Sequence, residues 1–181
     1  MNKALLIPFA LILCLMLEPV PCHGFDRIDG PEKAELAKAW QTFLNAVSAN
    51  DIRTIRNLSA EKIRCLACVD NTDREDEEMT RFRATDPDWY ETLYREKIFI
   101  PVEVFCEQDY PLVFSEPLKR RMREKTPVFA VEDFDGRKLH VVIVQTSEPG
   151  EFSPRDEGVV HLFQFVKTDH GYRFWGIDTI P

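Results

Sequence analysis

The stretch "TPVFAVEDFDGRKLHVVIVQT", residues 126–146, decides how the fold is interpreted. Two runs rich in β-branched residues flank the dipeptide Asp-Gly at 135–136, which favours the tight turn of a hairpin. The later runs "GVVHLFQFVK" and "YRFWGIDTI" flank the turn signal Thr-Asp-His-Gly at 168–171 and predict a second hairpin. With the polar connection 147–158 between them, these segments predict a meander of four antiparallel strands.

The first half of the chain has the periodicity of helices. Apolar residues recur at three- and four-residue steps from Leu36 to Val47, which predicts an amphipathic helix from Pro31 to about Asn50. Asp51 can cap a short second helix. Further short helices are predicted to begin after Asp86, Pro101, Asp109 and Ser115.

Two segments between these helices carry weaker signals. Residues 59–68 fit either a helix or a strand, and the acidic run in 69–88 predicts an exposed, mobile loop. Helices followed by a meander predict an α+β fold, with N-terminal helices packed on one face of a curved, four-stranded antiparallel sheet.

The segments "AWQTFLNAVSANDIRTIRNL" (39–58) and "HLFQFVKTDHGYRFWGIDTIP" (161–181) resemble the NTF2-like (cystatin-like cone) superfamily. The resemblance implies a curved sheet around an apolar cone cavity, frequent dimerisation through the sheet, and polar groups inside the cone of the enzyme members. It covers the two ends of the domain. The helical, acidic middle segment, 69–125, departs from the family, whose middle is shorter.

The N-terminus has the pattern of a secretory signal peptide. Lys3 precedes the uncharged apolar run 4–17, which is short for a transmembrane span and is followed by prolines. We therefore predict a cleaved signal peptide, residues 1–24, and a single secreted or periplasmic domain, residues 25–181. Lipid attachment at Cys22 and an uncleaved anchor are the less favoured alternatives.

Composition narrows the range of partners. The formal net charge is −8 and 44% of the residues are hydrophobic, so the chain can form a core and presents an acidic surface. Such a surface argues against nucleic acid and anionic membranes as partners. The sequence has no Gly-rich phosphate loop, nucleophile elbow or paired metal-binding histidines, so no cofactor or metal is predicted.

Hairpin turns fix the register of the strands they join. The turn at 168–171 predicts that His161 lies opposite Asp178, and the turn at 135–136 predicts that Val131 lies opposite His140. These four residues share one face of the predicted sheet. On that face we predict a ligand pocket lined by Phe129, His140, Phe163, Phe165 and Phe174. The residues predicted on the other face are Leu139, Val141, Ile143, Val160, Leu162, Val166, Trp175 and Ile177.

Both predicted faces are apolar, whereas an antiparallel sheet with one solvated face alternates more cleanly. We therefore expect helices to cover one face. A partner subunit or an inserted segment would cover the other, so a homodimer through the sheet is possible.

His161 and Asp178 are the candidate catalytic residues. A carboxylate can hold an imidazole in one tautomer and raise its basicity, which suits general acid–base chemistry. The alternative is a cross-strand charge pair without chemistry.

The cysteines predict a disulfide. Cys65, Cys68 and Cys106 follow the predicted signal peptide, and an exported protein meets an oxidising compartment. We expect a bond that involves Cys106, with its partner undecided. A redox dithiol at Cys65 and Cys68 and a zinc site are the alternatives.

The function that these observations favour is an exported, non-catalytic binding or interaction module. It would hold a small apolar ligand or a protein in the cone cavity or on the sheet face. The alternatives are a small cyclase or isomerase that uses His161 and Asp178, and a thiol redox protein.

Overall fold

The computed structural model describes residues 25–180, so the predicted signal peptide lies outside the described residues. Seven strands form one mixed sheet in the order β1-β4-β5-β6-β7-β2-β3. The strands are β1 (Asp26–Arg27), β2 (Ser59–Cys65), β3 (Phe99–Pro101), β4 (Val128–Phe134), β5 (Arg137–Ser147), β6 (Val159–Thr168) and β7 (Gly171–Ile180).

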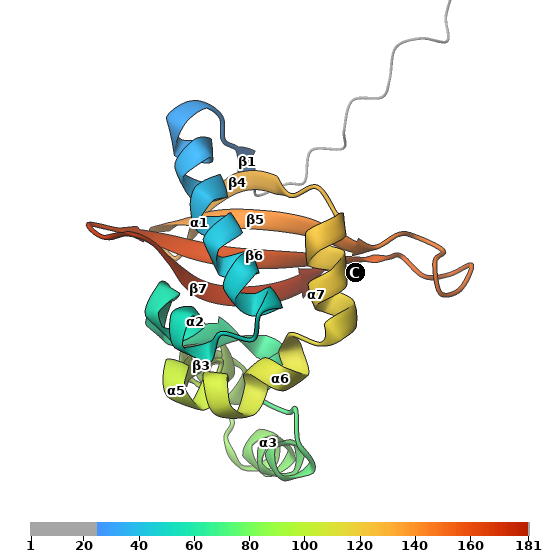
Figure 1. Cartoon of the computed structure of the whole chain (residues 1–181). Coiled ribbons are helices and arrows are strands. Elements are labelled where there is room, and N and C mark those ends of the chain that lie inside the picture. The colour runs from blue at the N-terminus through green and yellow to red at the C-terminus, as the bar shows by residue number, and fades with distance from the viewer. Residues whose placement is uncertain (1–24, 181) are drawn as a thin grey trace, which may run out of the picture.

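The helices precede most of the sheet in the chain (Figure 1). They are α1 (Gly30–Ser48), α2 (Ile52–Leu58), α3 (Asp73–Thr85), α4 (Trp89–Thr92), α5 (Val102–Val104), α6 (Tyr110–Val113) and α7 (Glu116–Glu124), with the single turns η1 (Leu66–Cys68), η2 (Leu93–Lys97) and η3 (Phe105–Asp109). Within residues 25–180, no helix has the length and hydropathy needed to cross a membrane.

The prediction of a four-stranded antiparallel sheet is wrong, although the α+β class is correct. The predicted meander is present as β4 to β7, but β2 joins β7 in parallel and makes the sheet mixed. Strands β3 and β1 extend the two edges. They span only three and two residues, too few to show a period in the sequence.

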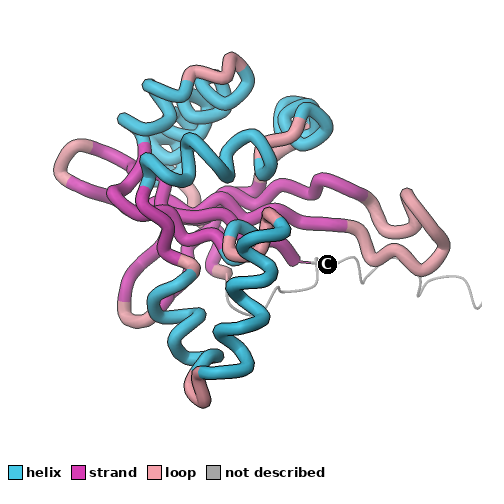
Figure 2. Tube along the Cα trace, turned by 90° about the horizontal axis from the view of Figure 1, so that it is seen from below, coloured by secondary structure: helices cyan, strands magenta, loops and turns pink. Residues whose placement is uncertain are grey.

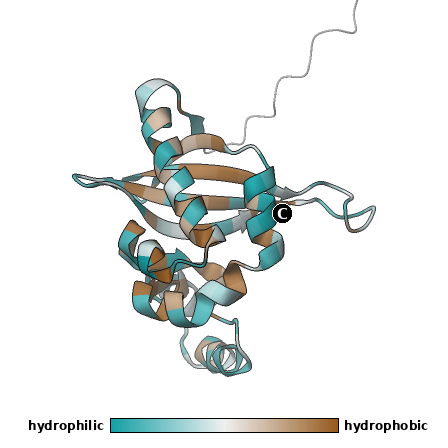
Figure 3. Ribbon diagram, viewed as in Figure 1, coloured by the Kyte–Doolittle hydropathy of each residue, from teal (hydrophilic) through white to brown (hydrophobic). Residues whose placement is uncertain are grey.

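One face of the sheet carries the main core, beneath α1, α2 and α7 (Figure 1). The buried ring of Phe43 lies 4.5 Å from that of Phe174 and 5.8 Å from that of Phe165, and Trp40 lies 4.9 Å from Phe163. Figure 3 shows hydrophobic residues, in brown, along the strands behind α1. The stripe predicted on the first helix therefore buries against the meander.

The opposite face carries a second, smaller cluster. Leu139, Val141, Leu162 and Trp175 are buried there. The ring of Phe99 approaches Trp175 from β3 at 5.7 Å, and that of Phe134 from β4 at 5.6 Å. Figure 2 shows helices on both sides of the sheet.

The prediction of a mobile loop over 69–88 is wrong, because α3 occupies most of this segment. The Thr72 hydroxyl accepts from the Glu75 backbone N–H, and the Glu75 carboxylate accepts from the Thr72 backbone N–H. This capping box starts the helix, and acidic side chains in the first turn interact favourably with the helix dipole. Met79 is buried against Leu93 and Ile98.

The expected disulfide to Cys106 is also wrong. Cys65 is bonded to Cys68, and Cys106 is a buried free thiol. Strand β2 ends at Cys65, and the η1 turn then brings the two Cα atoms to 5.4 Å, within the range that a disulfide requires. The bond therefore closes the turn where β2 leaves the sheet.

Candidate ligand cleft

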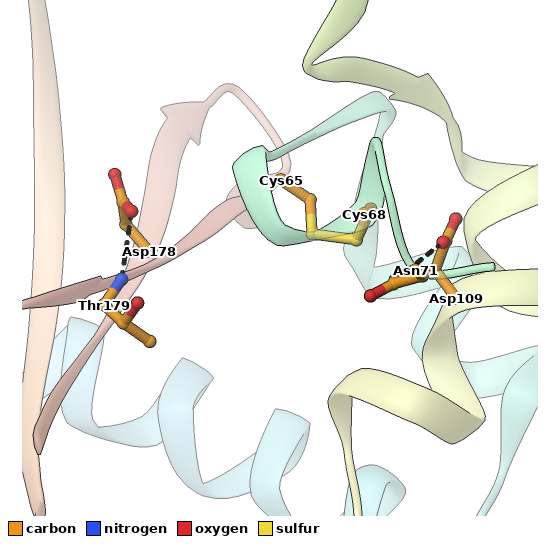
Figure 4. The surroundings of a disulfide bond; sticks show 6 residues. All are labelled: Cys65, Cys68, Asn71, Asp109, Asp178 and Thr179. Carbon is orange, nitrogen blue, oxygen red and sulfur yellow. Dashed lines mark hydrogen bonds between the residues drawn. A yellow bond between two sulfur atoms is a disulfide. The ribbon is translucent and has the colours of Figure 1, made fainter. Parts of the chain in front are cut away.

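A cleft of about 570 Å³ opens where β2 departs from β7. The parallel pairing ends at Cys65 and Ile177, whereas β7 continues to Ile180 and remains paired with β6. In Figure 4, Asp178 and Thr179 lie to one side of the disulfide turn, and Asn71 and Asp109 lie to the other. The disulfide turn therefore forms part of the cleft wall.

Aromatic and aliphatic side chains from α4, η2 and α6 form another wall. Tyr90 is 60% exposed and Leu112 is 53% exposed, although both are large and apolar. The ring of Tyr90 lies 5.6 Å from that of Trp89 and 4.9 Å from that of Tyr94. Burial, followed by the proximity of Tyr90, raises the pKa of Tyr94. Exposed apolar side chains that gather in a concavity are typical of a binding surface.

His161 lines the cleft with one ring nitrogen already engaged. The Thr146 hydroxyl donates to the Val159 carbonyl (3.1 Å) and lies 2.8 Å from Nδ1 of His161. Because a hydroxyl has one hydrogen, which here goes to the Val159 carbonyl, we infer that Thr146 accepts from Nδ1–H. Nε2 is then the unprotonated nitrogen, and within residues 25–180 it has no hydrogen-bond partner. Burial lowers the pKa of His161 to about 4, so the ring is neutral at neutral pH.

The predicted pairing of His161 with Asp178 is wrong. Thr179 is the cross-strand partner of His161, and Leu162 that of Asp178. A bulge where Gln164 and Phe165 meet β7 shifts the register by one residue, which turns the next side chains of β7 to opposite faces. Ile177 accordingly packs in the main core rather than on the other face.

The Asp178 carboxylate is engaged elsewhere. Its Oδ2 accepts from Arg64 Nη1 at 2.7 Å, and its Oδ1 accepts from the Thr179 backbone N–H at 2.9 Å. Asp178 therefore does not orient His161, although both residues line the cleft.

Gly176 allows the register shift and the close packing around it. A Cβ atom at this position would lie 2.8 Å from Oε1 of Gln164 and 2.9 Å from Cβ of Arg64. No real side chain tolerates such contacts without movement of its neighbours. An isolated glycine within a strand often marks a bulge, so Gly176 is the sequence signal that could have predicted the shift.

The five residues predicted to line a pocket lie elsewhere. Phe163, Phe165 and Phe174 are buried in the core against α1, and Phe129 packs at its margin. His140 is also buried, and its Nε2 donates to Glu32 Oε1 at 2.8 Å. Hydrogen bonds from Lys138 and His140 lower the pKa of Glu32 to about 2. Aromatic side chains thus fill the space beneath α1, and none of the five lines the cleft.

The charged groups of the cleft occur in pairs. Arg83 lies 3.8 Å from Asp70, and its guanidinium lies 5.7 Å from the ring of Trp89. Arg64 pairs with Asp178, the second carboxylate of the cleft. The cleft therefore presents little uncompensated charge to a ligand.

Over the part of the chain that the structure describes, no cluster of three or more His, Cys, Asp or Glu is placed to hold a metal ion. No protein-family model matches the chain, and no curated protein is similar to it in sequence. The chemistry of the cleft is therefore inferred from its own geometry.

Proposed function

We propose that the protein is an exported, non-catalytic binding module that holds a small, largely apolar ligand in the cleft at the end of β7. The observation that carries this function is the exposed wall of Tyr90, Tyr94 and Leu112 beside Nε2 of His161, which has no hydrogen-bond partner among residues 25–180. Ligand sites are typically clefts of roughly 300–1,000 Å³ with apolar walls and a few placed polar groups. The cleft, of about 570 Å³, falls in this range.

Export is part of the proposal, as is membership of the NTF2-like superfamily. The signal-peptide pattern of residues 1–24 supports export. The bond between Cys65 and Cys68 agrees with it, because disulfides persist mainly in oxidising compartments.

Binding without catalysis is supported by the state of His161. A general base works best when its pKa lies near the working pH, whereas burial holds the pKa of His161 at about 4. The carboxylate that would raise its basicity, Asp178, is occupied by Arg64.

A structural role for the disulfide is supported by its burial. Thiol–disulfide exchange requires a thiolate to reach one of the sulfur atoms. Cys65 is fully buried and Cys68 is 2% exposed, so access to this bond is restricted.

Filling the cleft tests the function. Ala67 is exposed in the disulfide turn and lines the cleft, so Ala67→Trp should occupy ligand space without disturbing the core. Ala34→Trp, at an exposed position of α1, is the matched control. We expect the neutral dye Nile red to bind the wild type and Ala34→Trp saturably, with a blue-shifted emission, and Ala67→Trp at least tenfold more weakly. Equal binding to all three proteins would contradict the proposal.

A further inference from the structure

We propose that the cleft selects a neutral aromatic ligand that carries a hydroxyl group, as phenols do, and that Nε2 of His161 accepts the hydrogen bond from this hydroxyl. Thr146 is the positioning residue that holds the imidazole in the accepting state. This inference rests on the proposed function and specifies the ligand class of the same cleft.

The accepting state is fixed by a chain of hydrogen bonds. The backbone carbonyl of Val159 accepts the Thr146 hydroxyl hydrogen, which leaves the hydroxyl oxygen to accept from Nδ1–H of His161. Thr146 is buried, so solvent competes poorly for this hydroxyl. The Phe163 ring lies nearly parallel to the imidazole, with the ring centroids 6.2 Å apart. The remaining nitrogen, Nε2, can accept a hydrogen bond but cannot donate one.

This restriction gives His161 a discriminating role that the hydroxyl groups of the cleft lack. The carboxylates of Asp70 and Asp178 also only accept hydrogen bonds, but they are paired with Arg83 and Arg64. The hydroxyls of Tyr90, Tyr94 and Thr179 can each donate or accept, so they adapt to either kind of ligand group. A ligand without a donor would cover Nε2 and leave a desolvated acceptor without a partner, which costs affinity.

Charge and shape complete the description of the ligand. Arg83 with Asp70 and Arg64 with Asp178 neutralise one another, so an ionic ligand would lose hydration without meeting an unpaired counter-charge. The side chain of Tyr90 is exposed, and an aromatic ligand can pack against its ring. These features together favour a neutral hydroxylated aromatic molecule.

A matched pair of probes tests the inference. 2-Naphthol and 2-methoxynaphthalene share a ring system, and methylation replaces the hydroxyl hydrogen, the only strong donor, with one methyl group. We expect 2-naphthol to bind the wild type about tenfold more tightly, as measured by calorimetry, with NMR shift changes confined to residues of the cleft.

Two variants assign this preference to the imidazole. His161→Phe keeps a ring of similar shape but removes the acceptor, so both probes should bind with equal affinity. Thr146→Val keeps the imidazole but releases its tautomer, so the preference should fall at least threefold. Thermal unfolding of each variant verifies that it is folded.

The outcomes separate the inference from the proposed function. Equal affinity of both probes for the wild-type cleft, or an unchanged preference in either variant, would overturn the role of His161 and leave the binding module standing. If Nile red binds the cleft and neither naphthalene does, the ligand class is wrong. If none of the three binds, the proposed function fails as well.

Discussion

Arg64 and Asp178 form a largely buried ion pair beside the cleft. The Arg64 side chain is 8% exposed and that of Asp178 is 26% exposed, and their polar atoms are 2.7 Å apart. The Arg64 guanidinium also lies 5.1 Å from the ring of Phe134. Within residues 25–180, Nε of Arg64 has no hydrogen-bond partner, and Asp178 is the carboxylate bonded to the guanidinium. Glu132 also interacts with it electrostatically.

Asp178→Asn should therefore destabilise the protein. The substitution removes the charge of the carboxylate that is bonded to a buried guanidinium, and we expect a loss of about 2–4 kcal/mol in the free energy of unfolding in urea. Glu96→Gln is the control, because Glu96 pairs with Arg95 on the surface and should lose less than about 0.5 kcal/mol. Equal losses in the two variants would contradict the structural role of the buried pair.

The low pKa of His161 predicts a specific pH dependence of stability. The ordinary pKa of histidine is about 6.5, so the unfolded chain takes up a proton at that pH while the folded ring stays neutral until about pH 4. The stabilisation is thus complete above pH 6.5 and is lost as the pH falls from 6.5 to 4. We expect the wild type to lose up to about 3 kcal/mol relative to His161→Phe over this window. Parallel stability curves for the two proteins would show that burial does not shift this pKa.

Among the elements, the η1 turn has the largest effect on the cleft. It ends β2 at Cys65 while β7 continues, and the Cys65–Cys68 bond holds the diverging chain. In the chain-entropy model, a disulfide that closes so short a loop raises the free energy of unfolding by only about 2 kcal/mol. A bond to Cys106 would close a longer loop and would raise it more. The bond therefore contributes more to the shape of the cleft wall than to global stability.

Thiol counting tests this pairing on a chain that begins at Phe25, in which the cysteines are Cys65, Cys68 and Cys106. We expect no reactive thiol in the native protein, because Cys106 is buried, and one after unfolding without reductant. Three thiols should react once the unfolded chain is reduced. Peptide mapping that finds Cys106 in the disulfide would contradict the structure.

Elements with a strong local sequence signal were predicted correctly, and elements without one were missed. The glycine turn at 135–136 correctly predicted that Val131 faces His140, because two strands joined by a tight turn have little freedom of register. The same reasoning failed beyond Gln164, where the bulge interrupts the ladder. Helix α3 was missed because its acidic composition concealed the capping box at Thr72.

For the whole molecule, the sheet is apolar on both faces, as predicted. Among the residues that suggested a dimer, Leu139 and Val141 are fully buried within one chain, and Leu162 and Trp175 nearly so. A homodimer through the sheet remains a prediction. Phe99 of β3 packs against Trp175, and β3 is distant in the sequence from the four strands of the meander. The local pattern of those strands therefore could not predict this burial.

The cleft could not be predicted from the sequence either, because long-range contacts form it. It is assembled from the end of β7, the disulfide turn, α4 with η2, and α6, which are far apart in the chain. Of its predicted residues, His161 and Asp178 do line it, but in separate roles. The hydrogen bond from His161 to Thr146 depends on the register between β5 and β6, with no motif to mark it.

The claim on which the proposed ligand site depends is that His161 presents an unprotonated Nε2 to the cleft. Long-range ¹⁵N–¹H correlation spectra of the imidazole measure this directly in the free protein at pH 7. We predict a neutral ring with the proton on Nδ1 and no titration until the pH approaches 4. A ring protonated at Nε2, or one that titrates near pH 6.5, would contradict it.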